Sequence, residues 1–485
     1  MTVDVLVVGA GAAGLATALA AARGGARVLV VEKDQRLGGT LHLSGGHLAA
    51  AGSRRQRQRG IVDSPAEHLD DIARISGASA RADLTQLVAE HAAETVDRLE
   101  EAGFAFAAET PRIVYGHEPY RIARTVYGVD EGLSILAVLE QELARAQAAG
   151  QALEVWTQAP VTGLLQSDGD SDGGGAVVGV EVLRGGREVA VRATAVVLAT
   201  GGYGADAELF TELEGVPLVS AAARTSTGDG IHLGRSVGAA LQGQGSYLPT
   251  FGGLPDPVSP GRANWHDRQR LTSERPPVEI YVDRDGNRWV AEDEPSIDEK
   301  ERALVGVAEQ TFWTVFDDAA LDGATGERQI VVGKEPDQVR AMANTRPGVH
   351  AAATLGELAQ LAGIDPAGLA ATVARYNDAV ARGEDAEFGR RHLPSPIATA
   401  PFYALRNHAV TLVTFQGLDV DAECAVRRAD GEVITGLHAV GEVIGAAATC
   451  GNSFCSGMLL TPALTLGRLL GERLAASVRD GGTGR

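Results

Sequence analysis

The sequence is poor in cysteine, in aromatic residues and in positive charge. Its 485 residues include only three cysteines, Cys424, Cys450 and Cys455, too few for the disulfide framework of a secreted domain. The spacing of Cys450 and Cys455 matches no zinc pattern, so no metal site is expected. The formal net charge is −20, which argues against nucleic-acid and anionic-membrane partners because both bind a basic face.

Long hydrophobic runs and common hydrolase motifs are also missing. The apolar stretch 5–22 is interrupted by three glycines, so we expect a strand, a turn and a helix there and no membrane span. No basic segment precedes the first strand, and a reducing cytoplasm is the default location. The sequence has no Ser/His/Asp triad, HExxH or P-loop signature. Glycine is abundant, 61 of 485 residues, without a Gly-X-Y period, which favours turns and cofactor loops.

The length predicts two or three domains. Residues 4–8, 12–23 and 27–32 read as strand, helix and strand, and such a β-α-β unit with short turns indicates a parallel sheet with a right-handed crossover. Further segments are expected as follows: helices at 65–103, 131–149, 366–382 and 457–475, and strands at 153–165, 176–183, 187–192, 195–199 and 437–440. The segment 167–175 is expected to be a solvated hairpin tip. The chain is therefore of the α/β class.

The first strand leads into Gly9-Ala-Gly11-Ala-Ala-Gly14. In this pattern the first glycine makes a tight turn, the second lets the backbone approach a pyrophosphate, and the third lets helix and strand pack closely. The following helix offers free N–H groups and a partial positive charge to the phosphates. Glu32, at the end of the second strand, is placed to hold ribose hydroxyls. Dinucleotide binding is predicted, and Gly39 in the next glycine pair favours FAD over NAD.

The remaining motifs resemble one family from end to end. In chain order they are Gly38-Gly39-Thr40 with Ser44-Gly45-Gly46, Arg124-Thr125 with Asp130-Glu131-Gly132, Ala199-Thr200-Gly201-Gly202, Thr227-Gly228-Asp229-Gly230, the segment 282–289, Val373-Ala-Arg-Tyr376-Asn377, and Gly441-Glu442 with the helix after Gly457. The chain thereby resembles the FAD-dependent fumarate reductase/succinate dehydrogenase flavoprotein superfamily, which includes 3-ketosteroid Δ1-dehydrogenases and tricarballylate dehydrogenase-like proteins.

The resemblance implies a Rossmann-like FAD-binding domain, residues 1–246 and 406–485, with an inserted α+β capping domain, residues 247–405. Substrate would bind between the two. The implied cofactor residues are Gly9, Gly11, Ala13, Gly14, Glu32, Lys33, Gly39, Thr40, Ser44, Gly45, Gly46, Val161, Thr200, Gly201, Asp229, Gly441, Glu442, Gly457, Leu459 and Leu460. The helix after Gly457 would direct N–H groups toward the flavin and stabilise negative charge on it. In some relatives a histidine is bonded to FAD, but that position falls at Gly39, not His42, so non-covalent FAD is expected.

The residues that clamp dicarboxylates in the family are replaced here. Its two clamp histidines fall at Phe251 and Leu412, and its clamp arginine falls at about Phe454. A buried Phe or Leu cannot pair a carboxylate, so fumarate and succinate are not expected as substrates. The family's Thr-Glu pair falls at Leu271 and Thr272, and its proton-donating arginine at about Ser296.

Tyr120 and Arg275 are the predicted acid–base residues, with Tyr115, Tyr127 and Tyr247 next in line. The predicted function is introduction or reduction of a C=C bond beside a carbonyl, with hydride transfer at flavin N5, on a mainly apolar, cyclic or ketosteroid-like small molecule. Two alternatives stay open, a flavin amine or amino-acid oxidase on the same scaffold and an electron-transfer flavoprotein subunit. The sequence leaves the electron acceptor open.

Overall fold

In the computed structural model, residues 1–167, 175–269 and 275–482 are described. The largest sheet has the strand order β18-β19-β8-β1-β2-β5, and β6 and β7 continue it from β8. The bounds are β1 (Thr2–Val8), β2 (Val28–Val31), β5 (Leu153–Trp156), β6 (Val161–Gln166), β7 (Val177–Arg184), β8 (Arg187–Leu198), β18 (Ala425–Arg427) and β19 (Val433–Ala439). The core strands β19, β8, β1, β2 and β5 pair in parallel. The carboxyl ends of these strands therefore meet at one edge of the sheet.

Strands β1 and β2 are almost completely buried because helices cover the sheet, as expected for parallel strands. The helices of this half are α1 (Ala12–Arg23), α2 (Arg54–Gln58), α3 (Pro65–Ile75), α4 (Ala82–Glu101), α5 (Gly132–Ala148), α6 (Ala207–Glu214), α7 (Asp229–Ser236), α13 (Ala447–Cys450) and α14 (Leu460–Gly482). Short helical turns lie at η1 (Gly39–His42) and η5 (Glu442–Ile444).

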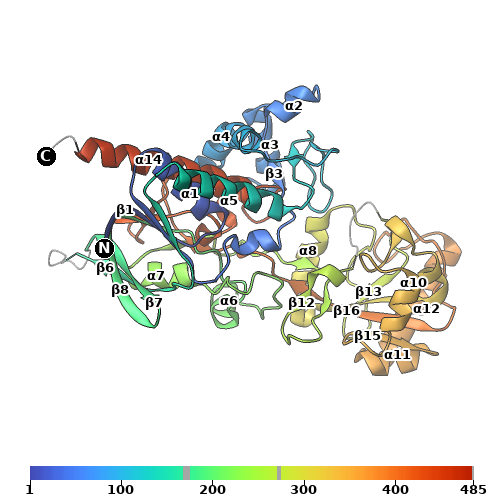
Figure 1. Cartoon of the computed structure of the whole chain (residues 1–485). Coiled ribbons are helices and arrows are strands. Elements are labelled where there is room, and N and C mark those ends of the chain that lie inside the picture. Colours follow the sequence, from blue (N-terminus) through green and yellow to red (C-terminus); the bar gives the residue numbers. More distant parts are fainter. Residues whose placement is uncertain (168–174, 270–274, 483–485) are drawn as a thin grey trace.

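The first and last helices of the chain pack side by side (Figure 1). A Cβ on Gly467 would lie 2.6 Å from the carbonyl oxygen of Ala13, and one on Gly471 would lie 2.3 Å from that of Thr17. These two glycines of α14 therefore permit its close approach to α1. The contact joins residues after 406 to the N-terminal unit, so both ends of the chain build one half of the molecule.

A second half, yellow to orange in Figure 1, lies at the far end from both termini. Its sheet has the order β10-β16-β14-β13, with β15 also paired to β16. Its bounds are β10 (Thr250–Phe251), β13 (Ile280–Val282), β14 (Thr311–Asp317), β15 (Val349–Ala352) and β16 (Phe402–Val410), with helices α8 (Ile297–Val305), α9 (Asp318–Asp322), α10 (Pro336–Met342), α11 (Leu355–Ala362) and α12 (Pro366–Arg382), and turns η2 (Trp265–Asp267), η3 (Ala308–Gln310) and η4 (Gly326–Arg328). Three short strand pairs complete the structure. They are β3 (Leu48–Ala49) with β4 (Thr125–Val126), β9 (Leu241–Gln242) with β17 (Gly417–Leu418), and β11 (Leu254–Pro255) with β12 (Ala263–Asn264).

Two motifs of this second half build its own core. A Cβ on Gly286 would lie 2.3 Å from the backbone nitrogen of Leu369, so the turn fits tightly against the start of α12. The buried guanidinium of Arg288 bonds the carboxylates of Glu292 and Asp385. Asn377 exchanges side-chain hydrogen bonds with the backbone of Ile397. These residues thus stabilise the capping half and do not face a ligand.

The observed helices and strands agree with the predicted ones, apart from local differences. The helices expected at 12–23 and 366–382 have those bounds. The helix expected at 65–103 is two helices, because the chain turns between Ser76 and Arg81. The predicted hairpin joins β6 and β7, but its tip, 168–174, lies outside the described residues. The expected domain boundary at 405/406 falls inside β16, and the division into domains stays a prediction.

Among the described residues, no helix combines the length and hydrophobicity that a membrane span requires. The same part of the chain holds no cluster of three or more His, Cys, Asp or Glu side chains that could bind a metal ion.

Candidate active site

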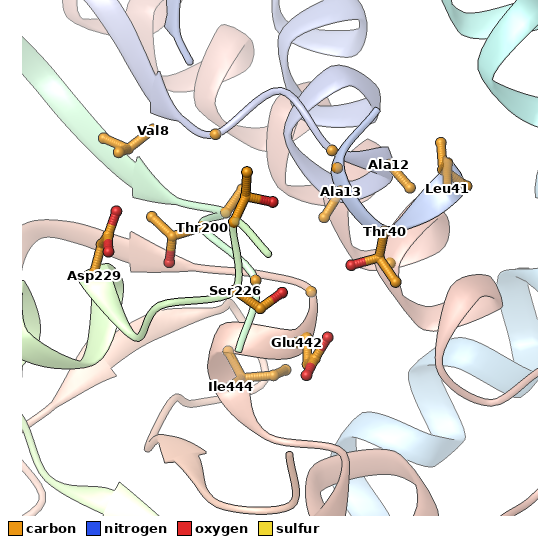
Figure 2. Close-up of a pocket in the computed structure, with 18 of the residues that line it drawn as sticks. Val8, Ala12, Ala13, Thr40, Leu41, Thr200, Ser226, Asp229, Glu442 and Ile444 are labelled. Atoms are coloured by element: carbon orange, nitrogen blue, oxygen red, sulfur yellow. The ribbon is translucent and has the colours of Figure 1, made fainter. Parts of the chain in front are cut away.

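A cleft of about 1400 Å³, including its open mouth, lies at the carboxyl edge of the parallel strands. Four loops form its walls, each directly after one strand: Gly9–Gly11 after β1, Glu32–Lys33 after β2, Thr200–Gly201 after β8, and Gly441–Glu442 after β19. Figure 2 shows Ala12, Ala13 and Thr40 on one side of the space and Thr200, Ser226 and Asp229 on the other. Open α/β sheets bind their ligands at this edge.

The three glycines of the first loop have different surroundings. Gly9 has φ +103°, and a Cβ there would lie 2.4 Å from the carbonyl oxygen of Ala199. A Cβ on Gly14 would lie 1.9 Å from the carbonyl oxygen of Gly9, so this glycine packs the helix onto the turn. By contrast, no atom lies within 4 Å of the position of a Cβ on Gly11. The space beside Gly11 is therefore the cleft itself, open to a ligand.

The carboxylate of Glu32 is held at the cleft wall. Its Oε2 accepts a hydrogen bond of 2.8 Å from the backbone nitrogen of Ala10, and its Oε1 accepts one of 2.8 Å from that of Asp34. A carboxylate has about four acceptor positions, so it can also accept from a ribose hydroxyl. The next residue, Lys33, pairs with Asp229 at 2.8 Å and with the hydroxyl of Thr227 at 2.5 Å. That pair joins the loop after β2 to the start of α7.

At the other end of the cleft, Glu442 packs against the loop after β8. A Cβ on Gly202 would lie 2.3 Å from Glu442 Oε1, so only glycine leaves room for this carboxyl group. Burial raises the pKa of Glu442, and hydrogen bonds from the backbone nitrogen and the hydroxyl of Thr414, 2.9 and 3.1 Å, oppose that rise. The loops after β8 and β19 and the segment near Thr414 are thereby fixed to one another.

The cleft wall includes most of the residues that the sequence predicts for the cofactor. They are Gly9, Gly11, Ala13, Glu32, Lys33, Gly39, Thr40, Ser44, Val161, Thr200, Gly201, Asp229, Gly441, Glu442, Leu459 and Leu460. Four predicted residues do not line it. Gly14 supports the turn, Gly45 lies beside the His47 ring, Gly46 packs on the backbone of Glu131, and Gly457 packs on that of Ala49. These glycines therefore pack against neighbouring segments and support the loops that line the cleft.

Other cleft residues have no signal in the sequence analysis. They include Val31, Ala159, Pro160, Thr225, Ser226, Val413, Ala446 and Thr449. Thr225 and Ser226 directly precede the predicted turn at 227–230, so extending that motif backwards would have found them. Val413, Ala446 and Thr449 follow no motif and come to the cleft through tertiary packing.

Comparison with known proteins assigns this cleft. A family model described as "FAD binding domain" matches residues 4–459. The chain belongs to this family. It is 28% identical over 482 residues to a fumarate reductase (cytochrome) of Shewanella frigidimarina, which covers 98% of this chain and 77% of the relative. It is also 28% identical over 558 residues to a 4-oxocyclohexanecarboxylate 2-dehydrogenase of Sinomonas cyclohexanicum, covering 98% of this chain and 93% of the relative.

Among solved structures, a 3-ketosteroid Δ1-dehydrogenase of Sterolibacterium denitrificans has the same fold. The TM-score is 0.80 at 20% sequence identity, over 98% of this chain and all of that one. This protein is thus an FAD-dependent oxidoreductase with a Rossmann-like FAD domain and a capping domain. It belongs to the dehydrogenases and reductases that introduce or reduce a C=C bond adjacent to a carbonyl.

The residues present fit FAD. The open space at Gly11 lies at the N-terminus of α1, where no side chain from the described residues caps the helix. The first backbone N–H groups of α1 are therefore available to a pyrophosphate. Glu32, at the end of the neighbouring strand, is the acceptor for ribose hydroxyls. When bound, FAD supplies hydride transfer at its N5 atom.

Two of the predicted substrate residues, Phe454 and Leu412, lie in apolar clusters, and the cluster of Phe454 reaches the cleft. Phe454 packs with Leu248 and Phe415, and this cluster reaches the cleft wall through Val413, Ala446 and Leu459. Leu412 lies in a neighbouring cluster around Val410. Thr250–Phe251 pairs with β16 at Val410 and Ala409, but the side chain of Phe251 lies outside what is described. Leu271 and Thr272 are likewise outside the described residues.

The predicted acid–base residues do not line the cleft. The buried hydroxyl of Tyr120 donates a hydrogen bond of 2.6 Å to the carbonyl oxygen of Ser456. Its ring lies over the guanidinium of Arg124, 4.8 Å from the ring centroid, and burial raises its pKa well above the ordinary value. Arg275 forms a buried ion pair with both carboxylate oxygens of Glu279. Their part in the reaction stays a prediction.

The three further candidate tyrosines are either hydrogen-bonded to other side chains or exposed to solvent. Tyr127 donates to Glu109 at 2.8 Å, Tyr247 donates to Gln310 at 3.3 Å, and Tyr115 is 38% exposed. The imidazole of His117 lies 5.2 Å from the ring of Phe454, and burial lowers its pKa to about 4. His117 is therefore neutral near pH 7 and adds no positive charge beside Phe454.

Proposed function

We propose that this FAD-dependent oxidoreductase acts on a mainly apolar, uncharged ketone, with cyclic ketones first among the candidates. The observation that carries the proposal is the cluster of Phe454, Phe415 and Leu248, which continues into the cleft wall at Val413 and Leu459. An apolar surface at this place favours burial of a hydrocarbon frame by about 25 cal/mol per Å². It cannot pair a substrate carboxylate, and a buried unpaired charge costs several kcal/mol.

The names of two relatives give substrates of different charge, a dicarboxylate in one case and a ketone with one carboxylate in the other. One is a fumarate reductase, and the other is a 4-oxocyclohexanecarboxylate 2-dehydrogenase. The apolar surroundings of Phe454 and the neutral state of His117 support a ketone over a dicarboxylate for this chain. The ketone carbonyl makes the neighbouring C–H bond acidic, which the removal of a proton beside it requires.

FAD is proposed to bind without a covalent bond. The imidazole Nε2 of His42 lies 2.8 Å from the carbonyl oxygen of Leu37, so this ring is already engaged within its own loop. Gly39 occupies the cleft wall where the bonding histidine of some relatives is expected, and it has no side chain to form the bond. Location in the cytoplasm stays a prediction, and the proposal names no electron acceptor.

The test follows the flavin absorbance anaerobically with a panel of small molecules. The oxidised enzyme is mixed with cyclohexanone, with 4-androstene-3,17-dione, with succinate and with benzylamine. The dithionite-reduced enzyme is mixed with cyclohex-2-enone, with 1,4-androstadiene-3,17-dione and with fumarate. We expect a ketone or an enone to change the redox state of the flavin, and succinate and fumarate to leave it unchanged. Steady reoxidation by fumarate, or bleaching by benzylamine alone, would refute the proposal.

A further inference from the structure

Two histidines lie where the flavin-binding half, the capping half and the apolar cluster of Phe454 meet. The ring of His117 lies 5.2 Å from the ring of Phe454, at an interplanar angle of 34°. The carboxylate of the next residue, Glu118, accepts a hydrogen bond from the hydroxyl of Ser296, the N-cap of α8. His117 therefore lies between the capping half and the apolar surface to which we assign the substrate.

His47 approaches the same place from the cofactor loop. It follows Ser44-Gly45-Gly46, and Ser44 lines the cleft. Its imidazole Nε2 lies 3.7 Å from the position of a Cβ on Gly45, so the ring lies beside the turn of this loop. The ring also packs against Tyr127, at a distance of 5.1 Å between the ring centroids. The imidazole of His47 is thus held directly next to the residues that line the cofactor cleft.

The two imidazoles are neighbours, and both are uncharged near pH 7. Burial, with a smaller contribution from His47, lowers the pKa of His117 to about 4. Burial also lowers the pKa of His47, and the guanidinium of Arg112 acts in the same direction. A neutral imidazole has one N–H donor and one acceptor nitrogen. The pair can therefore donate hydrogen bonds beside an apolar surface without placing an unpaired charge there.

The surroundings of His117 indicate which of its nitrogens carries the proton. Its Nδ1 is buried and has no hydrogen-bond partner among the described residues. The partner of one imidazole nitrogen decides where the proton resides, and Nδ1 has no acceptor to which it could donate. The proton is therefore assigned to Nε2. Because the side chain is only partly buried, this N–H group is available to an oxygen atom of a ligand.

We propose that His117 and His47 bind the ketone oxygen of the substrate by hydrogen bonds from their imidazole N–H groups. This inference deepens the ketone function proposed above and rests on it. The hydrocarbon frame of the substrate lies against Phe454, and its oxygen lies between the two rings. In either direction of the C=C reaction, negative charge develops on that oxygen. N–H donors that are already in place stabilise this charge, as in an oxyanion hole.

The test removes the donors one at a time in the holoenzyme. His117→Phe keeps a ring against Phe454 without its nitrogens, and His47→Phe does the same beside Tyr127. The dithionite-reduced enzyme is mixed with cyclohex-2-enone or 1,4-androstadiene-3,17-dione in a stopped-flow instrument. Flavin reoxidation in each variant should be about 10²–10³-fold slower, as for a lost oxyanion donor. The enone Kd should rise only about 2- to 10-fold, the effect of losing a hydrogen bond to a neutral oxygen. FAD content should not change.

Two controls separate the donor from the packing of the ring. His117→Gln places an amide N–H near the position of Nε2 and should recover most of the lost rate. His91→Phe makes the same exchange on α4, where His91 is 38% exposed and lies 3.8 Å from Glu94, and it should behave as the wild type. A measurement without turnover uses infrared difference spectra of carbonyl-labelled cyclohexanone bound to the oxidised holoenzyme. Hydrogen bonding should lower the frequency of the carbonyl band, and His117→Phe should reverse that shift.

Wild-type rates and an unchanged carbonyl band in both His117→Phe and His47→Phe would overturn the proposal and leave the ketone function in place. If His117→Phe does not retain FAD, His117→Ala, which only removes atoms, is measured instead. A wild-type enzyme that responds to no ketone and no enone would refute the ketone function first, and would overturn this proposal with it.

Discussion

The sharpest test of the cofactor site compares two glycines that stand three residues apart. Gly11→Ala adds a methyl group where no atom lies within 4 Å, and Gly11 has the extended backbone angles φ −77° and ψ −172°, which any residue adopts. The free energy of unfolding of the apoprotein should therefore change by less than about 0.5 kcal/mol. The methyl group would, however, occupy the space in which the pyrophosphate approaches α1.

The cost should appear in FAD binding. Losing one hydrogen bond between a helix N–H group and a charged phosphate costs about 1.5–3 kcal/mol, which is about a 10- to 150-fold higher Kd at 1.4 kcal/mol per tenfold. Gly14→Ala is the opposite case, because its Cβ would lie 1.9 Å from the carbonyl oxygen of Gly9. The helix must then shift away from β1, and overpacking of this kind costs about 1–3 kcal/mol of stability.

Both quantities can be measured on the same samples. Urea unfolding of the apoprotein, followed by circular dichroism, gives the stability, and quenching of FAD fluorescence gives the Kd. We expect Gly11→Ala to separate the two effects, with normal stability and weak FAD binding, and Gly14→Ala to lose stability. A Gly11→Ala variant that binds FAD with the wild-type Kd would refute the assignment of the pyrophosphate to this loop.

Two further predictions concern the cofactor bond and the predicted acid–base residues. Acid precipitation of the yellow holoenzyme should release free FAD, because His42 is bonded to Leu37 and Gly39 has no side chain; flavin that stays in the precipitate would contradict non-covalent binding. Tyr120→Phe should lower the free energy of unfolding by about 1–3 kcal/mol, because the buried carbonyl of Ser456 loses its donor. Arg275→Leu should lower it by about 3–5 kcal/mol, because Glu279 loses its ion-pair partner. Arg284→Leu, an exposed control, should have little effect. If Tyr120 or Arg275 also moves the proton, its variant slows flavin reduction about 10²–10⁴-fold at unchanged FAD content; wild-type rates would exclude that part in catalysis.

The FAD half of the cleft could be predicted from the sequence because local backbone geometry builds it. Gly9 has a positive φ, Gly14 packs on the carbonyl oxygen of Gly9 in the same turn, and Glu32 follows the adjacent strand. Each feature needs only a few neighbouring residues. Gly202 is different, because it is required by the carboxyl group of Glu442, which lies far along the chain.

The substrate half could be predicted only in its composition. Phe454 and Leu412, which stand where the family has clamp residues, lie in apolar clusters, and their contact with substrate stays a prediction. Tyr120 and Arg275 could not be placed in the same way, because a tyrosine or arginine in a loop gives no sign of its partner. Tyr120 meets Ser456, far along the chain, and Arg275 meets Glu279, four residues away in a segment without helix. Neither contact follows from a pattern.

Asp298 and Glu301 show why buried acids are hard to predict from this sequence. Three residues apart in a helix with Glu299 and Lys300, they resemble a solvated charged face in the sequence. Their burial arises only when α8 packs on the loop at Ser453 and on β10, segments that lie about 150 residues later and about 50 residues earlier in the chain. An acid that must hold a proton near neutral pH needs burial more than it needs a motif. Groups of this kind are therefore found from packing and not from a pattern in the sequence.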